Sequence, residues 1–173
     1  AVDDGLFEAV VVLSFSAMFR ERLKNLPEEM REARFRNIGD PTRGDRLKST
    51  FEDGVESRYV YSGIAAFELA FKGIDGVLSD GNVWLAKNMF SLAEINLTPM
   101  LARLEYLTLL DIWLSRRPVV KKWWERVKKR TSYDAEVVGM LSEDEVSEMQ
   151  TSGARIKDRI FDIHANYIKS LGD

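Results

Sequence analysis

The chain has 173 residues, of which 45% are hydrophobic and 31% are charged, a composition typical of a globular protein of one domain. It has no cysteine and one histidine, His164, which excludes a disulfide framework, a zinc–thiolate site, a cysteine nucleophile and a multi-histidine metal site within these residues. The net charge of −3 at pH 7 argues against nucleic acid as the main partner, and no apolar run is long enough to span a bilayer.

The first predicted element is a helix from about residue 4 to residue 26. Apolar residues follow two adjacent stripes along it, so the helix should pack against more than one neighbour. The first stripe contains Leu6, Val10, Leu13, Ala17 and Arg20. The second stripe contains Phe7, Val11, Phe15, Met18 and Arg22. Pro27 ends this helix and suits the first turn of a short second helix.

A loop is predicted over residues 37–45, because the segment is rich in Gly, Pro and Asp. A long helical region follows from about residue 47 to residue 78. Gly54, Gly63 and Gly73 interrupt it, and each mid-helix glycine costs about 1 kcal/mol relative to alanine. A single straight helix is therefore not expected, and Gly63 is a candidate for a kink or a close helix contact.

After a turn at residues 79–82, Ser91 and Glu94 have the S-x-x-E spacing of a capping box. In this motif each side chain binds the backbone N–H of the other residue, and losing such a cap costs about 1 kcal/mol. Both residues are therefore assigned a structural role. The helix that they begin should run to about residue 107 and bend at Pro99, whose ring removes a hydrogen-bond donor.

Two more helices complete the chain. One begins near Pro118 and ends at Thr131 and Ser132. The last spans about residues 142–171, with a second possible capping box at its start and Gly153 as its weak point. No strand pattern of period two occurs, so the sequence predicts an all-α, multi-helix bundle.

Charge is segregated in the second half of the chain. Residues 116–130 contain eight basic residues and one acid, and residues 134–148 contain six acids and no base. The preferred interpretation is two solvated faces. A phosphate- or RNA-contact patch on the basic segment is the alternative.

No side chain in the sequence is a convincing catalytic group. Ser14 and Ser16 have no histidine near them in sequence, and a serine–histidine pair is established by geometry. The paired carboxylates are adjacent residues, which do not face each other on a helix and are interpreted as solvated.

Three segments carry a family resemblance. They are W-L-A-K-N-M-F-S-L-A-E at residues 84–94, L-T-P-M-L-A-R-L-E at residues 97–105, and R-P-V-V-K-K-W-W-E-R-V at residues 117–127 with R-T-S-Y at 130–133. In this order and at about this spacing they resemble the C-terminal helical domain of cytosolic, bacterial-type glutathione transferases. The match covers residues 84–133. The departures from the family pattern are Lys87 for a glycine, Asn88 for an aspartate and Glu94 for the capping aspartate.

The resemblance implies a single helical domain over residues 1–173. It places the glutathione site and the activating residue on a thioredoxin-like domain upstream of residue 1, so no catalytic residue is expected in this chain. The implied reaction is the addition of glutathione thiolate to an electrophilic substrate. The implied partners are glutathione as co-substrate, the thioredoxin-like domain, a hydrophobic electrophile and a second copy in a homodimer, in the cytoplasm.

The same resemblance implies a hydrophobic substrate pocket on the first helix and at the end of the core helix. The residues that it places there are Val11, Ser14, Phe15, Met18, Arg22 and Tyr106. For Phe15 and Met18, ordinary burial in the core is the alternative. Two other functions stay open: a non-catalytic protein-interaction module of glutathione-transferase type, and a stand-alone helical domain.

Overall fold

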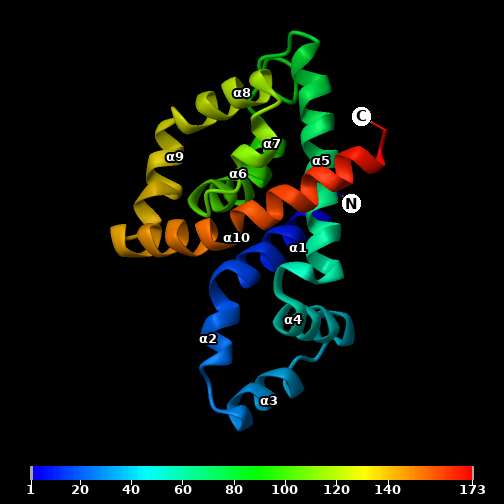
Figure 1. The fold of residues 1–173 in the computed structure, drawn as a ribbon. Coiled ribbons are helices and arrows are strands. Elements are labelled where there is room, and N and C mark those ends of the chain that lie inside the picture. The colour runs from blue at the N-terminus through cyan, green and yellow to red at the C-terminus, as the bar shows by residue number, and fades with distance from the viewer. Residues whose placement is uncertain (1, 173) are drawn as a thin grey trace.

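The computed structural model describes residues 2–172, with side chains from residue 5 onward. Helices dominate this range, and within it only isolated bridges represent β structure, which confirms the all-α prediction. Helices α5 and α10 cross close to α1 (Figure 1), while α2 to α4 extend to one side and α6 to α9 to the other. Among residues 2–172, no helix combines the length and the apolarity that a membrane crossing requires.

The first predicted helix is present but is not regular. It consists of α1 (Val2–Ser14), a π-helical turn η1 (Phe15–Phe19) and α2 (Arg20–Lys24), which follow one another without a break. Helix α3 (Glu28–Arg36) begins directly after Pro27, as predicted. The π turn is a feature that the sequence analysis did not foresee.

The loop predicted for residues 37–45 is wrong beyond Asp40, because helix α4 (Pro41–Asp53) begins there. The Asp40 carboxylate accepts a hydrogen bond from the N–H of Thr42 at 2.9 Å, and Pro41 occupies the first helical position. An acidic cap followed by proline is a helix-start signal. The same residue types are also frequent in loops, which is why the prediction failed here.

The expected interruption of the next helical region occurs at Gly54. Its φ angle is +60°, and it ends α4 at a short 3₁₀ turn, η2 (Gly54–Glu56). Helix α5 (Arg58–Ser79) then continues through the other two glycines. At Gly63 a Cβ atom would lie 3.2 Å from the Cα of Ala9, so the predicted close helix contact is confirmed.

Helix α6 (Leu92–Tyr106) begins at the predicted capping box. The buried Glu94 carboxylate accepts hydrogen bonds from the backbone N–H of Ser91 at 2.9 Å and from the Ser91 hydroxyl at 2.7 Å. It also accepts one from the N–H of Leu85 at 2.6 Å. Burial alone would raise the pKa of Glu94, but these hydrogen bonds outweigh it and lower the pKa below its usual value.

We expect Ser91→Ala to lower the free energy of unfolding by about 1 kcal/mol, because an orphan N–H of the first turn loses its acceptor. For a chain of this size that loss lowers Tm by about 2–4 °C in a thermal melt. Ser142→Ala, at an exposed capping box, is the control and should lower Tm less. An unchanged Tm in Ser91→Ala would contradict the structural role of the cap.

The loop before α6 contains a strained residue at the position where the family pattern has glycine. Lys87 has a φ of +65°, a left-handed conformation that costs a residue with a Cβ about 1–2 kcal/mol. The backbone N–H of Trp84 donates to the Lys87 carbonyl at 2.8 Å, which fixes this turn. The left-handed turn therefore forms although its residue is a lysine.

Lys87→Gly should accordingly stabilise the fold by about 1 kcal/mol, since it relieves the left-handed strain. Lys72→Gly is the matched control, because Lys72 is exposed in the interior of α5. It should destabilise the fold by a similar amount of about 1 kcal/mol. Urea unfolding of both variants measures the two opposite signs, and a loss of stability in Lys87→Gly would refute the strain at this position.

The remaining helices are α7 (Asp111–Leu114), α8 (Pro118–Lys128), α9 (Thr131–Glu136), the 3₁₀ turn η3 (Val138–Met140) and α10 (Glu143–Ser170). The sequence analysis missed α7, and Thr131 begins α9 where a helix end was expected. The second capping box, Ser142 with Glu145, is confirmed at the start of α10.

Gly153 is not the weak point of α10. A Cβ atom built on it would lie 1.8 Å from the carbonyl oxygen of Leu107, at the end of α6. The glycine therefore allows two backbones to touch, and the expectation of a defect in the helix is corrected to a packing contact.

The core lies where α1, α5, α6, α8 and α10 meet. Its largest fully buried side chains come from α5, α7 and α8, and they are Phe67, Phe71, Trp113, Trp123 and Trp124. Leu13 of α1, Leu101 of α6 and Ile160 of α10 belong to the same cluster. This packing holds α1 and α6 in fixed positions relative to each other.

Candidate functional site

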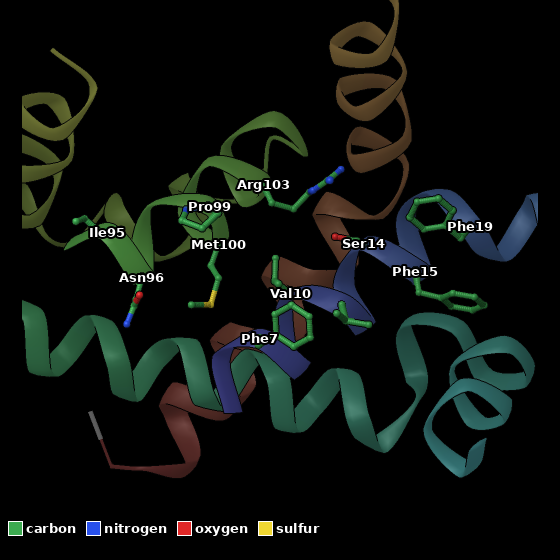
Figure 2. A pocket seen from close by; sticks show the side chains of 11 residues that line it. Phe7, Val10, Ser14, Phe15, Phe19, Ile95, Asn96, Pro99, Met100 and Arg103 are labelled. Carbon is green, nitrogen blue, oxygen red and sulfur yellow. The ribbon is translucent and has the colours of Figure 1, made fainter. Parts of the chain in front are cut away.

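A hollow of about 640 Å³ lies between the first helix and α6, and we call it the α1–α6 hollow. Figure 2 shows its two walls, one from α1 and η1 and the other from α6. The lining residues are Phe7, Val10, Val11, Ser14, Phe15, Phe19, Ile95, Asn96, Pro99, Met100 and Arg103. Its volume lies within the range of small-molecule sites in proteins.

The walls of this hollow are largely apolar. Ser14, Asn96 and Arg103 supply its polar side-chain groups, and Arg103 is its one charged lining residue. A guanidinium nitrogen of Arg103 lies 2.9 Å from the sulfur of Met149, which holds the cation at the edge of the core. Apolar walls with a few polar groups suit a hydrophobic ligand that carries hydrogen-bond acceptors.

The wall on the first helix is unusually exposed. The exposed fractions are 62% for Phe7, 43% for Val11 and 41% for Phe19. A contiguous apolar surface of this kind marks a ligand or partner site more often than single exposed residues do. Phe7 and Val11 of the second predicted stripe therefore face outward, whereas the apolar residues of the first stripe are buried in the core.

The structure places three of the six predicted pocket residues, Val11, Ser14 and Phe15, in the wall of the α1–α6 hollow. Met18, Arg22 and Tyr106 do not line it. Met18 is buried in the core, where the alternative interpretation put it, and the exposed Arg22 forms an ion pair with Glu148 of α10. Tyr106 is half-buried beside the core, and burial raises the pKa of its hydroxyl.

The π turn explains why Met18 leaves the stripe. A π helix closes its hydrogen bonds one residue later than an α-helix does, so the residues after it are rotated relative to a regular helix. The outward stripe consequently runs Phe7, Val11, Phe15, Phe19. Phe19 replaces Met18 in the wall because of this extra residue.

Sequence reasoning missed the wall that α6 provides. Ile95, Asn96, Pro99 and Arg103 recur on one side of α6, opposite the leucines that fill the core. The helical period of the segment was the available signal. The sequence prediction named only the core stripe of this helix.

The α6 wall lies in a segment that is similar to known proteins. Residues 64–130 match the family model described as "Glutathione S-transferase, C-terminal domain". Residues 64–130 thus have the sequence pattern of a glutathione S-transferase C-terminal domain. A stretch of 54 residues is 41% identical to "Glutathione S-transferase TCHQD" of Arabidopsis thaliana, covering 31% of this chain and 20% of that relative. The match therefore spans about a fifth of the relative's length. No solved structure matches the chain.

The α1–α6 hollow lies between this matched segment and the first helix. Its α6 wall lies within residues 64–130, whereas its wall on α1 and η1 lies before the matched segment. The packing of α1 on α5 through Gly63 brings the two parts together.

Several side chains of the basic segment, residues 116–130, have partners within the protein. Arg117 forms a buried ion pair with Glu68, and Lys128 binds Glu105 at 2.7 Å. The guanidinium of Arg130 lies 3.8 Å from the ring centre of Phe90, and Arg126 also faces the aromatic loop before α6. These contacts favour a structural role over the alternative of a phosphate or RNA patch.

The titratable side chains of residues 2–172 form no metal-type cluster. These residues do not bring three His, Asp or Glu side chains together in a group that could hold a metal ion. His164 hydrogen-bonds to Glu68 at 2.8 Å, which uses the histidine in a buried network on α5 and α10. The apolar walls of the α1–α6 hollow suit an apolar ligand.

Proposed function

We propose that this chain is the helical, substrate-binding half of a glutathione S-transferase, and that its α1–α6 hollow holds the hydrophobic electrophile. The observation that carries the proposal is the apolar hollow itself, built from an exposed apolar stripe on the first helix and one face of α6. The electrophile would lie against Phe15 and Phe19. Arg103 and Asn96 would bind its electron-withdrawing groups.

The proposed reaction joins the glutathione sulfur to the electrophile. The thiolate is the nucleophile, and its attack forms the carbon–sulfur bond while a leaving group departs or a double bond is saturated. This chain contributes binding and orientation of the electrophile and no group that attacks. A thioredoxin-like domain would bind glutathione and lower the pKa of its thiol.

The exposed apolar stripe supports two further parts of the proposal. A thioredoxin-like domain facing Phe7, Val11 and Phe19 would cover that stripe and complete the site. A second copy of the chain, in a homodimer, is the other partner that we propose. We also propose a cytoplasmic location, which is compatible with a chain that contains no cysteine.

The test uses the full-length protein that carries this chain, with 1-chloro-2,4-dinitrobenzene as the electrophile and glutathione as co-substrate. Phe19→Ala should raise KM for the electrophile about fivefold, because it removes apolar wall from the hollow. KM for glutathione should change less than twofold. Phe161→Ala is the matched control, since Phe161 is 53% exposed on α10 and lies outside the hollow.

Two results would count against the proposal. A full-length protein that neither binds immobilised glutathione nor conjugates the electrophile is not a transferase. Equal effects of Phe19→Ala and Phe161→Ala on KM would show that the hollow does not hold the substrate.

A non-catalytic interaction module is the second candidate function. Met89, in the loop before α6, and Leu92, the first residue of α6, are among the most exposed apolar side chains of the described residues, and such residues suit a protein partner. The glutathione-binding experiment separates the two functions. A module without a glutathione site would fail it and would still lose its partner when Met89 and Leu92 are both replaced by serine.

A further inference from the structure

A groove of about 510 Å³ lies between α6 and α9, and we call it the α6–α9 groove. Ile95, Thr98 and Pro99 of α6 form one wall, and Tyr133 and Val137 form the other. The second wall follows residues 64–130, so the match to the family model does not account for the groove. Most of the lining is hydrocarbon, which suits apolar side chains of a partner.

Exposed apolar side chains follow directly after the α9 wall. Val138 is 49% exposed and Met140 is 72% exposed, and both belong to η3. This segment lies at an outer corner of the molecule, where α9 leads into α10 (Figure 1). Methionine is flexible and polarisable, and it is common at surfaces that adapt to a protein partner. The groove and this corner together offer apolar contacts to a segment of protein.

Acidic side chains flank these apolar residues. Residues 134–148 contain six acids and no base. Two of the acids have partners within the protein, since Glu145 completes the capping box of α10 and Glu148 pairs with Arg22. The other four carboxylates are exposed and form no ion pair or hydrogen bond with any side chain that the structure describes. They belong to Asp134, Glu136, Glu143 and Asp144.

Glu136 connects this negative charge to the groove, because it both lines the groove and ends α9. A carboxylate at the last residue of a helix opposes the helix dipole. Arg130 is the one cation among the described lining residues. Its guanidinium lies 3.8 Å from the ring centre of Phe90 and forms no ion pair with Glu136. A cation supplied by a partner would therefore offset the charge at Glu136.

We propose that the α6–α9 groove is a docking site for a basic amphipathic helix of another protein. Apolar side chains on one face of that helix, spaced i, i+3, i+4 and i+7, would enter the groove and contact Val137, Val138 and Met140. Lysine or arginine side chains beside that face would reach Glu136 and the other free carboxylates. The site is separate from the proposed electrophile site, and the inference rests on neither of the two proposed functions.

The sign of the charge distinguishes this partner from two others. Nucleic acids and anionic membrane surfaces attract cations, so four free carboxylates would repel both of them. A basic helix is attracted instead, because complementary charges speed the encounter and select the partner. This attraction should weaken as the salt concentration rises.

The experiment measures binding of a labelled synthetic peptide to the full chain by fluorescence anisotropy. The probe has about eighteen residues, with leucine at the helical anchor positions and lysine elsewhere. One comparison peptide has glutamate in place of every lysine, and a second has the same leucines and lysines in scrambled order. The probe should bind at least tenfold more tightly than either comparison peptide. Phosphatidylserine vesicles should not bind the chain.

Charge variants test the carboxylates of α9. Asp134→Asn with Glu136→Gln should weaken binding of the probe at least fivefold, because two counter-ions of the helix are lost. Glu28→Gln with Glu29→Gln is the matched control, since it removes the same charge from two exposed residues of α3. This control should change the affinity less than twofold.

A second pair of variants tests the apolar contact. Met140→Ser should weaken binding of the probe at least threefold, because the helix loses an apolar anchor. Met30→Ser is the matched control, since Met30 is 52% exposed on α3, away from the groove. All of these side chains are exposed, and far-UV circular dichroism checks that the variants keep their helix content.

The opposite results would overturn the proposal. Equal binding of the lysine and glutamate peptides, or binding of the vesicles, would show that the acids do not select the partner. Equal losses in the two double variants would reduce the effect to net charge, and unchanged binding in Met140→Ser would remove the apolar contact. Self-association in light scattering that is lost in Asp134→Asn with Glu136→Gln would assign the groove to a second copy of the chain.

Discussion

Gly153→Ala should lower the free energy of unfolding by about 3 kcal/mol or more, because the added Cβ has no room. It would lie 1.8 Å from the Leu107 carbonyl oxygen and 2.8 Å from the Leu107 Cα. Both are backbone atoms, which cannot move aside as the end of a flexible side chain can. Helix α10 would have to separate from the end of α6. The core around Leu104 and Leu107 would then lose its contact with α10.

Gly73→Ala is the matched control for this prediction. Gly73 lies inside α5, and a Cβ built on it meets no atom within 4 Å. Alanine there should stabilise the fold by about 0.5–1 kcal/mol, because it restricts the unfolded chain and favours the helix. Urea unfolding followed by far-UV circular dichroism measures both variants. A Gly153→Ala variant as stable as the native chain would show that the two backbones do not touch.

The second large effect is expected at Glu68. This carboxylate is buried between Arg117 and His164, with His164 Nε2 at 2.8 Å, and Arg117 also donates to the carbonyl of Trp113 at 3.0 Å. Glu68→Gln keeps the shape of the side chain and removes its charge, which leaves Arg117 buried without a counter-ion. Breaking a buried pair in this way costs about 3–5 kcal/mol, measured as the loss in the free energy of unfolding.

An exposed ion pair provides the comparison for Glu68. Glu56 binds Arg159 through two hydrogen bonds of 2.6 and 2.8 Å at the surface. Glu56→Gln removes the same charge there and should cost much less, because water screens exposed pairs. Equal losses in Glu56→Gln and Glu68→Gln would contradict the importance of burial.

The same network makes the free energy of unfolding depend on pH. Burial would raise the pKa of Glu68, but hydrogen bonds from Arg117 and His164 outweigh it and hold the pKa below its ordinary value of 4.5. A carboxyl group whose pKa is lowered by folding stabilises the protein above its ordinary pKa. This stabilisation should disappear as the pH falls below 4.5 through the lowered pKa, and the loss should be smaller in Glu68→Gln.

Local signals in the sequence predicted most of the helices. Both capping boxes, the helix after Pro27 and the contact at Gly63 follow from residue types within one or two turns. Helix α7 was missed because its four residues are too few to show a period. The start of α4 was missed because aspartate and proline are as common in loops as at helix caps.

The sequence could not predict the buried charged pair or most of the candidate site, because both depend on contacts between residues that are distant in the sequence. Glu68 and His164 are 96 residues apart, and no periodicity connects them. Likewise, the α1–α6 hollow could be predicted only from the distance between α1 and α6, and the sequence does not give that distance. Val11, Ser14 and Phe15 were placed by the family resemblance, whereas Arg103 required the structure.

The π turn at Phe15–Phe19 bears on any comparison of this chain with glutathione S-transferases. A π turn contains one more residue than a regular α-helical turn. Its geometry is that of an α-helix into which a single residue has been inserted. A relative whose first helix is regular would need a one-residue gap here in an alignment by structure. Residue roles transferred from such a relative are in register up to Ser14 and shifted by one position from Arg20 onward.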